Sequence, residues 1–318
     1  KPLAAMTLKS LLLVVALVSD SAHEAAAADD ASCRSVRFAD VGWSDIAAST
    51  GMASVVLDAL GYKPSTTVAS IPIAFTGMKN RQIDVFLGYW VPSMSQVMEP
   101  FIQAGQIQVL DTPNLVGAKY TLAVPRYLFD KGLKNFSDIT RFRKELDGKI
   151  HGIEPGTDGN LLIQGMIRDN TFGLKGFTLV ESSESAMLVA AQLAGRNRKA
   201  IVFLGWEPHP MNVQLKMNYL AGGDEVFGPD LGEAKVYTAV AAGYREKCPN
   251  VAALLANLQF NAEMQSTVMG PILQKLRPTV AARSFLKKNP AVIEPWLKGV
   301  TTFDGKDGLA AVTAALAK

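Results

Sequence analysis

Short apolar runs alternate with longer segments of helical period along the first part of the chain beyond Ser35. This alternation predicts strands near 36–39, 68–74 and 84–87, and helices near 45–60 and 77–82. Short strands separated by helices are typical of βαβ units, in which neighbouring strands run parallel. We therefore expect an α/β protein with mostly parallel sheets flanked by helices.

A second series with the same alternation follows the first. Its predicted strands, again separated by helices, are 120–124, 149–153, 177–180 and 200–203. The pattern then changes to one strand, 235–241, followed by apolar residues at helical spacing. We interpret the two series as two lobes, the first formed by 29–115 plus 220–318 and the second by 116–219. Two lobes joined by two crossings form a hinge that can enclose a ligand.

A tryptophan follows closely after a glycine at the end of three predicted strands. These residues are Trp43, Trp90 and Trp206. Open α/β sheets bind ligands at the carboxyl ends of their strands, and several aromatic faces together suit a quaternary ammonium ion. For a single ring at a strand end, core packing is the better interpretation, and we also expect it for Trp296, whose apolar neighbours recur at helical spacing. Three rings in the same setting favour a site for a trimethylammonium cation.

The segment 1–28 has the pattern of a secretory signal peptide. Lys9 precedes an apolar run at 11–18, and small residues follow at 25–28. The apolar run is shorter than the roughly 20 residues of a membrane-spanning helix. We expect cleavage near Ala28 and export of the mature chain to the periplasm of a Gram-negative bacterium.

Two cysteines, Cys33 and Cys248, lie in the expected mature chain. An even number of cysteines in an exported protein favours a disulfide, which would return the C-terminal segment to the first lobe. A lipid-modified Cys33 is the alternative. It fits less well because the preceding residues, 30–32, lack the apolar side chain expected before such a site.

Charge and catalytic motifs narrow the classes of function. The formal net charge is +3 and 19% of the residues are charged, so nothing indicates a nucleic-acid partner. His23, His151 and His209 lack metal-ligand spacing, and the sequence contains no nucleophile elbow, dinucleotide fingerprint or phosphate-binding loop. We expect no metal, no cofactor and no catalytic residue, and we therefore favour binding over catalysis.

Five further sequence motifs occur in order along the chain. They are Gly42-Trp43-Ser44-Asp45, Leu87-Gly88-Tyr89-Trp90, and the segments 114–120, 152–156 and 205–212. Together they resemble the glycine betaine/choline substrate-binding protein family, which includes periplasmic choline-binding proteins of bacterial ABC importers. The resemblance covers nearly all of the mature chain. It implies the two-lobed type II periplasmic binding protein fold, with the ligand between the lobes, and delivery of that ligand to an ABC permease in the inner membrane.

The same resemblance implies an aromatic box that holds the trimethylammonium group. Its rings correspond here to Trp43, Trp90, Tyr120 and Trp206. We expect Asp45 to accept a hydrogen bond from the choline hydroxyl, although its place before an apolar helix fits a helix N-cap equally well. In the turn 155–160 we expect Asn160, or else Asp158, to contact the hydroxyl end of the ligand.

The polar end of the ligand distinguishes the candidate substrates. Asp45 and Asp158 would repel a betaine carboxylate but can accept a bond from a hydroxyl, so we expect choline, with acetylcholine as an intermediate case. The alternatives are a receptor for glycine betaine or carnitine and, from another class, an exported choline-ester hydrolase. A hydrolase needs a nucleophile such as Ser44 and a base, yet neither His151 nor His209 has an evident orienting carboxylate in the sequence. We expect a monomer without enzymatic activity.

Overall fold

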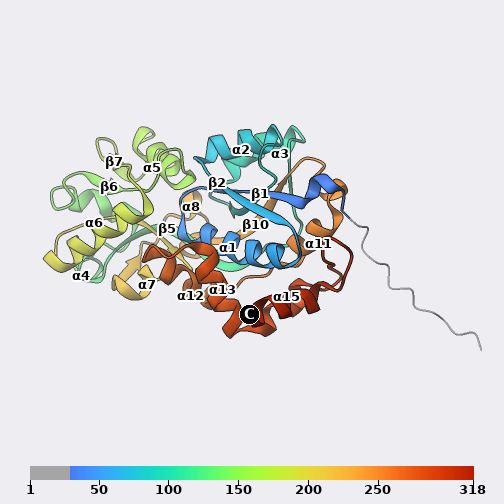
Figure 1. Cartoon of the computed structure of the whole chain (residues 1–318). Helices are drawn as coiled ribbons and strands as arrows, with labels where there is room; N and C mark the ends of the chain where they lie inside the picture. Colours follow the sequence, from blue (N-terminus) through green and yellow to red (C-terminus); the bar gives the residue numbers. More distant parts are fainter. Residues whose placement is uncertain (1–28) are drawn as a thin grey trace, which may run out of the picture.

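A computed structural model describes residues 29–318 (Figure 1), so the predicted signal peptide lies outside the described residues. The strands form one mixed ten-stranded sheet in the order β2-β1-β3-β10-β5-β8-β6-β7, with β4 beside β10 and β9 beside β5. The strands are β1 Ser35–Asp40, β2 Lys63–Val68, β3 Val85–Val91, β4 Ile107–Val109, β5 Leu115–Pro125, β6 Lys149–His151, β7 Thr178–Val180, β8 Phe203–Glu207, β9 Met217–Tyr219 and β10 Glu233–Ala241.

Parallel pairing occurs in two groups at the two ends of this sheet. The first strand group is β2, β1 and β3, and the second strand group is β8, β6 and β7. Between the groups lie β10 and β5, which pair antiparallel with each other and with β3 and β8. The predicted parallel sheets are therefore present as these two groups, and antiparallel strands link them. The lobe boundaries at 115/116 and 219/220 stay a prediction.

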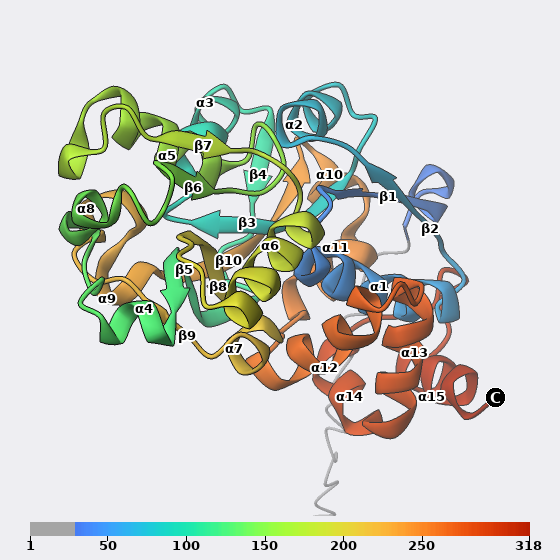
Figure 2. The same cartoon turned by 90° about the vertical axis from the view of Figure 1, so that its left-hand side faces the viewer.

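Helices surround both strand groups, and those of the C-terminal segment gather beside α1 (Figure 2). The α-helices are α1 Ser44–Ala59, α2 Ile71–Lys79, α3 Ser95–Gln103, α4 Arg126–Asp130, α5 Asp158–Arg168, α6 Glu184–Asn197, α7 Met211–Gln214, α8 Asp224–Phe227, α9 Pro229–Gly232, α10 Tyr244–Lys247, α11 Pro249–Asn257, α12 Ala262–Leu273, α13 Pro278–Lys288, α14 Ile293–Trp296 and α15 Gly308–Ala317. The short 3-10 helices are η1 Ala31–Arg34, η2 Phe136–Phe142, η3 Thr171–Gly173 and η4 Pro290–Val292.

Helix α1 is buried along almost its whole length because other elements cover it on several sides. Its many small residues, among them Ala48 and Gly51, allow α12 and α13 to pack closely against it. A Cβ at Gly51 would lie 2.8 Å from the carbonyl oxygen of Pro278, the first residue of α13. A larger residue here would push the two helices apart. This close packing fixes the helix whose first turn faces the site described below.

The prediction of a strand at 68–74 is wrong. The strand β2 ends at Val68, the first residue of this segment, and α2 begins within it at Ile71. Ser70 precedes the helix and Pro72 occupies its first turn, a position that suits proline because its missing N–H would be unpaired there anyway. Strand β2 lies at the edge of the sheet and is largely exposed, so its sequence lacks the apolar alternation that would mark a strand.

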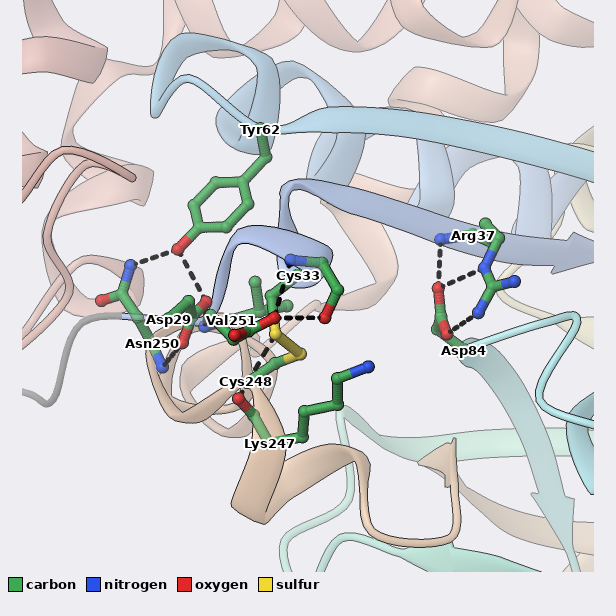
Figure 3. Close-up of a disulfide and its surroundings, with 11 residues drawn as sticks. Asp29, Cys33, Arg37, Tyr62, Asp84, Lys247, Cys248, Asn250 and Val251 are labelled. Atoms are coloured by element: carbon green, nitrogen blue, oxygen red, sulfur yellow. Dashed lines mark hydrogen bonds and ion pairs between the residues drawn. A yellow bond between two sulfur atoms is a disulfide. The ribbon is translucent and has the colours of Figure 1, made fainter.

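The predicted disulfide between Cys33 and Cys248 is confirmed (Figure 3), with a Cα–Cα distance of 5.7 Å. The same region is held by Asp29, whose carboxylate accepts hydrogen bonds from the Tyr62 hydroxyl at 2.8 Å and from the Asn250 backbone N–H at 2.7 Å. The start of the described chain is thus tied to Cys248 and to the first turn of α11. Within residues 29–318 no helix is long and apolar enough to cross a membrane.

Candidate ligand-binding site

A small cavity of about 10 Å³, room for about one water molecule, lies between the two strand groups. Six side chains line it, and each is at most 5% exposed: Trp43, Asp45, Trp90, Tyr120, Ile153 and Trp206. Trp43 immediately precedes α1, and Trp90 lies near the end of β3. Tyr120 comes from β5 and Trp206 from β8. The structure therefore brings all four aromatic residues predicted from the sequence to one cavity.

Three of the rings follow one another across the cavity wall. The ring centroids of Trp90 and Tyr120 are 5.9 Å apart, and those of Tyr120 and Trp206 are 6.1 Å apart with the planes at 83°. Tyr120 and Trp206 are directly paired residues of the antiparallel strands β5 and β8. The sheet register itself places these rings side by side, and their contacts have the tilted or edge-to-face geometry that aromatic pairs prefer.

Two glycines allow the aromatic residues to reach these positions. A Cβ at Gly88, two residues before Trp90, would lie 2.0 Å from the Ile46 side chain of α1, so β3 and α1 can approach only with glycine there. A Cβ at Gly159 would lie 2.0 Å from the Tyr120 hydroxyl. The glycine that precedes Trp90 in the sequence motif is thus required by packing between the strand and the helix that carries Asp45.

Asp45 supplies the acidic group of the cavity. Its Oδ2 accepts a hydrogen bond from the Trp90 indole N–H at 3.3 Å, and its Oδ1 has no hydrogen-bond partner among residues 29–318. Burial raises the pKa of Asp45 to about 8, and the nearby Glu184 carboxylate adds to the shift. The alternative role of helix N-cap is wrong, because Trp43 occupies that position and Asp45 lies in the first turn. A cation in the cavity would favour the ionised carboxylate.

The two residues predicted in the 155–160 turn lie beside the cavity without lining it. The Asn160 side chain is engaged by the loop before α5: its Oδ1 accepts from the Ile153 N–H at 2.9 Å, and its Nδ2 donates to the Ile153 carbonyl at 3.1 Å. Asp158 is 1% exposed, and burial raises the pKa of its carboxyl to about 6. Asn160 thus shapes the loop that presents Ile153.

Sequence reasoning missed Ile153 and a buried carboxylate beside the cavity, Glu184. Glu184 Oε1 accepts a hydrogen bond from the His209 ring at 2.8 Å, and Ser44 donates to the same carboxylate through its backbone N–H at 2.7 Å and its hydroxyl. The expectation that His209 has no orienting carboxylate is therefore wrong. Glu184 lies 140 residues from Ser44 and 25 from His209 along the chain, so no local pattern could reveal the contact.

The described residues contain no cluster of three or more His, Cys, Asp or Glu side chains that could hold a metal ion. The site is instead an aromatic cage with one carboxylate, located between the two parallel strand groups. Such a cage can enclose an organic cation but presents few polar groups for chemistry on it. Fold and site together define the class of two-lobed substrate-binding proteins with the type II periplasmic binding protein fold.

The chain belongs to the OpuAC family, described as "Substrate binding domain of ABC-type glycine betaine transport system", whose model matches residues 34–288. Proteins of this family serve transporters, and substrate-binding proteins of ABC importers are extracytoplasmic.

Solved structures and a curated relative agree with this assignment. The chain is 52% identical to an ABC-transporter choline binding protein in complex with choline, over 91% of this chain and 100% of that one, with a TM-score of 0.89. An ABC-transporter choline binding protein in an unliganded semi-closed conformation, also 52% identical, covers 90% of this chain and 100% of its own with a TM-score of 0.82. The glycine betaine/carnitine transport binding protein GbuC of Listeria monocytogenes is 29% identical over 52% of this chain and 54% of its own length.

Proposed function

We propose that this protein captures choline between its two lobes and delivers it to the permease of an ABC importer. The observation that carries the proposal is the cage of Trp43, Trp90, Tyr120 and Trp206 around a cavity that also contains Asp45. Each cation–π contact in a desolvated cage contributes about 2 kcal/mol, which suits a trimethylammonium group. The high similarity to a choline-binding protein solved with choline supports the same ligand.

Asp45 is the residue that favours choline over a betaine. Its Oδ1 lacks a partner within the described chain and can accept the hydrogen bond of an alcohol. The carboxylate of glycine betaine or carnitine would meet an acidic group at the same place, at an unfavourable electrostatic energy unless Asp45 keeps a proton. Acetylcholine retains the cation but lacks the hydroxyl donor, so we expect intermediate affinity. Asn160 and Asp158 remain in the proposal as residues that support the polar end from behind the cavity wall.

The arrangement around Ser44 argues against the rival hydrolase. In a hydrolytic triad the imidazole accepts the proton of the nucleophile, and the carboxylate orients the imidazole from its other nitrogen. Here the Ser44 hydroxyl donates directly to Glu184. His209 Nδ1 accepts the Met211 backbone N–H at 2.9 Å, so its proton lies on Nε2 and points to Glu184. The ring thus has no free lone pair for Ser44, and we propose a protein that catalyses no reaction.

The cellular setting follows from the same proposal. We propose that residues 1–28 are a signal peptide, that the mature protein functions as a monomer in the periplasm, and that lobes 29–115 plus 220–318 and 116–219 close over the ligand. Closure would distinguish loaded from empty receptor for the permease, because a ligand shifts the equilibrium only as far as it binds the closed form more tightly.

Calorimetric titration of the mature protein with choline, glycine betaine and carnitine, followed in parallel by tryptophan fluorescence, tests this proposal. We expect choline to bind with micromolar or lower Kd and the betaines to bind at least tenfold more weakly. If glycine betaine binds more tightly, the cage remains the site and the ligand is glycine betaine instead of choline. Absence of binding by all three would refute the proposed function.

A further inference from the structure

The buried carboxylate of Glu184 lies outside the cage and has no part in the proposed contacts to choline. Glu184 is the first residue of α6 and is 3% exposed. A buried carboxylate is costly unless it is fully hydrogen bonded, and this one accepts from Ser44 N, Ser44 Oγ and His209 Nε2. Its partners come from opposite sides of the cavity, since Ser44 follows β1 of the first strand group and His209 follows β8 of the second.

The contact with Ser44 caps the helix that carries two cage residues. The N-cap position of α1 is occupied by Trp43, whose side chain makes no capping hydrogen bond. A helix N-terminus favours an acceptor for its free N–H groups and a negative charge near its positive dipole end. Glu184 supplies both from the other side of the cavity, accepting the Ser44 N–H at 2.7 Å. The cage requires tryptophan at a position where most helices use serine or aspartate.

Residues that follow strands of the second group hold Glu184 in place independently of Ser44. His209 is 3% exposed, and the Met211 N–H bound to its Nδ1 fixes the tautomer that donates to Glu184. The backbone N–H of Glu184 donates to Glu154 Oε1 at 3.0 Å. His209, Glu154 and Glu184 all follow strands of the second group, so this half of the network can persist when the two sides separate. Of the hydrogen bonds that Glu184 accepts, only those from Ser44 come from the first strand group's side.

We propose that Glu184 is a positioning residue that couples occupation of the cage to closure, by capping α1 only when the two sides meet. The proposal rests on the proposed function to the extent that a ligand drives closure. Contact of Trp43 and Asp45 with a cation brings the start of α1 toward Tyr120 and Trp206, and Glu184 then completes the helix. The energy of the cap is gained only in the closed form, so it prolongs the lifetime of the complex.

The variant Glu184→Gln tests the cap with little change in side-chain volume. Every partner of Glu184 is a donor, so a glutamine must direct its own NH₂ group at a donor in either orientation. Loss of hydrogen bonds to a charged acceptor should weaken choline binding roughly tenfold or more. Stopped-flow tryptophan fluorescence should assign this loss to a faster koff, with kon changed less than threefold. Glu145→Gln, at an exposed position of the same predicted lobe, makes the same change of charge and should bind choline as the unaltered protein does.

A second variant separates the cap from the charge. Ser44→Ala removes one hydrogen bond to Glu184 and changes no charge, so it should raise koff several-fold. In the double variant the effects should be less than additive, because both changes remove the same contact. Ser44→Ala should change the melting temperature of the ligand-free protein only slightly. It should reduce the rise in melting temperature on adding choline by more, as expected for a contact specific to the closed form.

The outcomes distinguish this inference from the proposed function. If the unaltered protein binds choline and Glu184→Gln leaves koff unchanged, the cap is refuted and the function stands. If the unaltered protein binds glycine betaine instead, the same koff comparison is made with that ligand. If it binds neither, the proposed function fails and the ligand-driven cap fails with it.

Discussion

Two buried tryptophan environments in this protein differ in how their polar atoms are satisfied. Trp296, in α14, is 1% exposed, packs against Phe260 with ring centroids 5.6 Å apart, and donates its indole N–H to the Gln259 carbonyl at 3.2 Å. Trp206, in the cage, is 3% exposed, yet its indole N–H has no hydrogen-bond partner within the described part of the chain. Burial alone therefore does not separate a core tryptophan from a binding-site tryptophan.

The difference shows what each region is adapted to do. Around Trp296 every surface of the ring is covered and its donor is paired, as expected of a core residue. Around the cage, ring faces border a cavity, and an oxygen of Asp45 also lacks a partner among residues 29–318. Polar atoms left unpaired at a cavity are costly in the absence of a ligand. We expect substitutions in the first region to affect folding and substitutions in the second to affect binding.

The largest effects should come from truncating these tryptophans. Trp296→Ala should lower the free energy of unfolding by about 3–5 kcal/mol, because a large buried side chain is removed. Trp90→Ala and Trp206→Ala should each weaken choline binding roughly 30-fold or more, the equivalent of about 2 kcal/mol for one cation–π contact. Chemical denaturation without ligand and calorimetry with choline measure the two quantities separately.

Normal choline binding by both Trp90→Ala and Trp206→Ala, together with loss of binding in a folded Trp296→Ala protein, would place the site elsewhere. Binding should instead be retained by the folded fraction of Trp296→Ala.

Removing the disulfide should lower the stability of the fold and leave choline affinity nearly unchanged. Cys33 and Cys248 are 215 residues apart and both are 1% exposed, so Cys33→Ala combined with Cys248→Ala removes a buried cross-link without adding a polar group. Loss of a native disulfide costs about 2–5 kcal/mol of stability. We expect a lower denaturation midpoint with a choline Kd within about twofold of the unaltered protein. A large change in Kd at full folding would show that the bridge also affects the cleft.

Much of the fold and of the cage could be predicted from the sequence because the signals are local. Trp90 and Trp206 close apolar strands just beyond a glycine, and their residue type already indicates an aromatic site. Strand β2 was misplaced because an exposed edge strand has no apolar alternation. The lobe boundaries and the ligand contacts themselves remain predictions.

The polar parts of the site were harder to predict because their geometry depends on residues far apart in sequence. Asn160 was predicted to reach the ligand, but its amide also contacts Glu181 at 3.1 Å, in a loop 21 residues further along the chain. Glu184 was missed altogether, since a glutamate at the start of a helix is ordinarily a solvent-exposed residue. Only the folded chain brings it to Ser44 and His209.

Asp45→Asn should produce a moderate effect confined to the ligand's polar end. The amide keeps the shape of the side chain but loses the charge and one acceptor, so choline should bind about tenfold more weakly. Glycine betaine should bind as tightly as before or more tightly, because the amide does not repel its carboxylate. Parallel calorimetric titrations give the ratio of the two Kd values. An unchanged ratio would remove Asp45 from the explanation of specificity.

The smallest effect, a few-fold change of affinity with pH, should have opposite signs for the two ligands. Burial raises the pKa of Asp45 to about 8, so near neutral pH it holds a proton when no cation is present. Choline favours the ionised carboxylate and lowers this pKa. The complex then binds fewer protons than the ligand-free closed form, and choline affinity should rise with pH until it levels off near pH 8.

For glycine betaine the linkage reverses, because the ligand's carboxylate favours the protonated form and raises the pKa of Asp45. The complex binds more protons, so betaine affinity should fall as the pH rises through about 8. Titrations from pH 6 to 9 would measure both slopes, and Asp45→Asn should flatten them over the upper part of this range. Asp158, with a pKa of about 6, contributes at the lower end. Slopes of the same sign for both ligands, or slopes that persist in Asp45→Asn, would mean that another group controls the polar end of the cage.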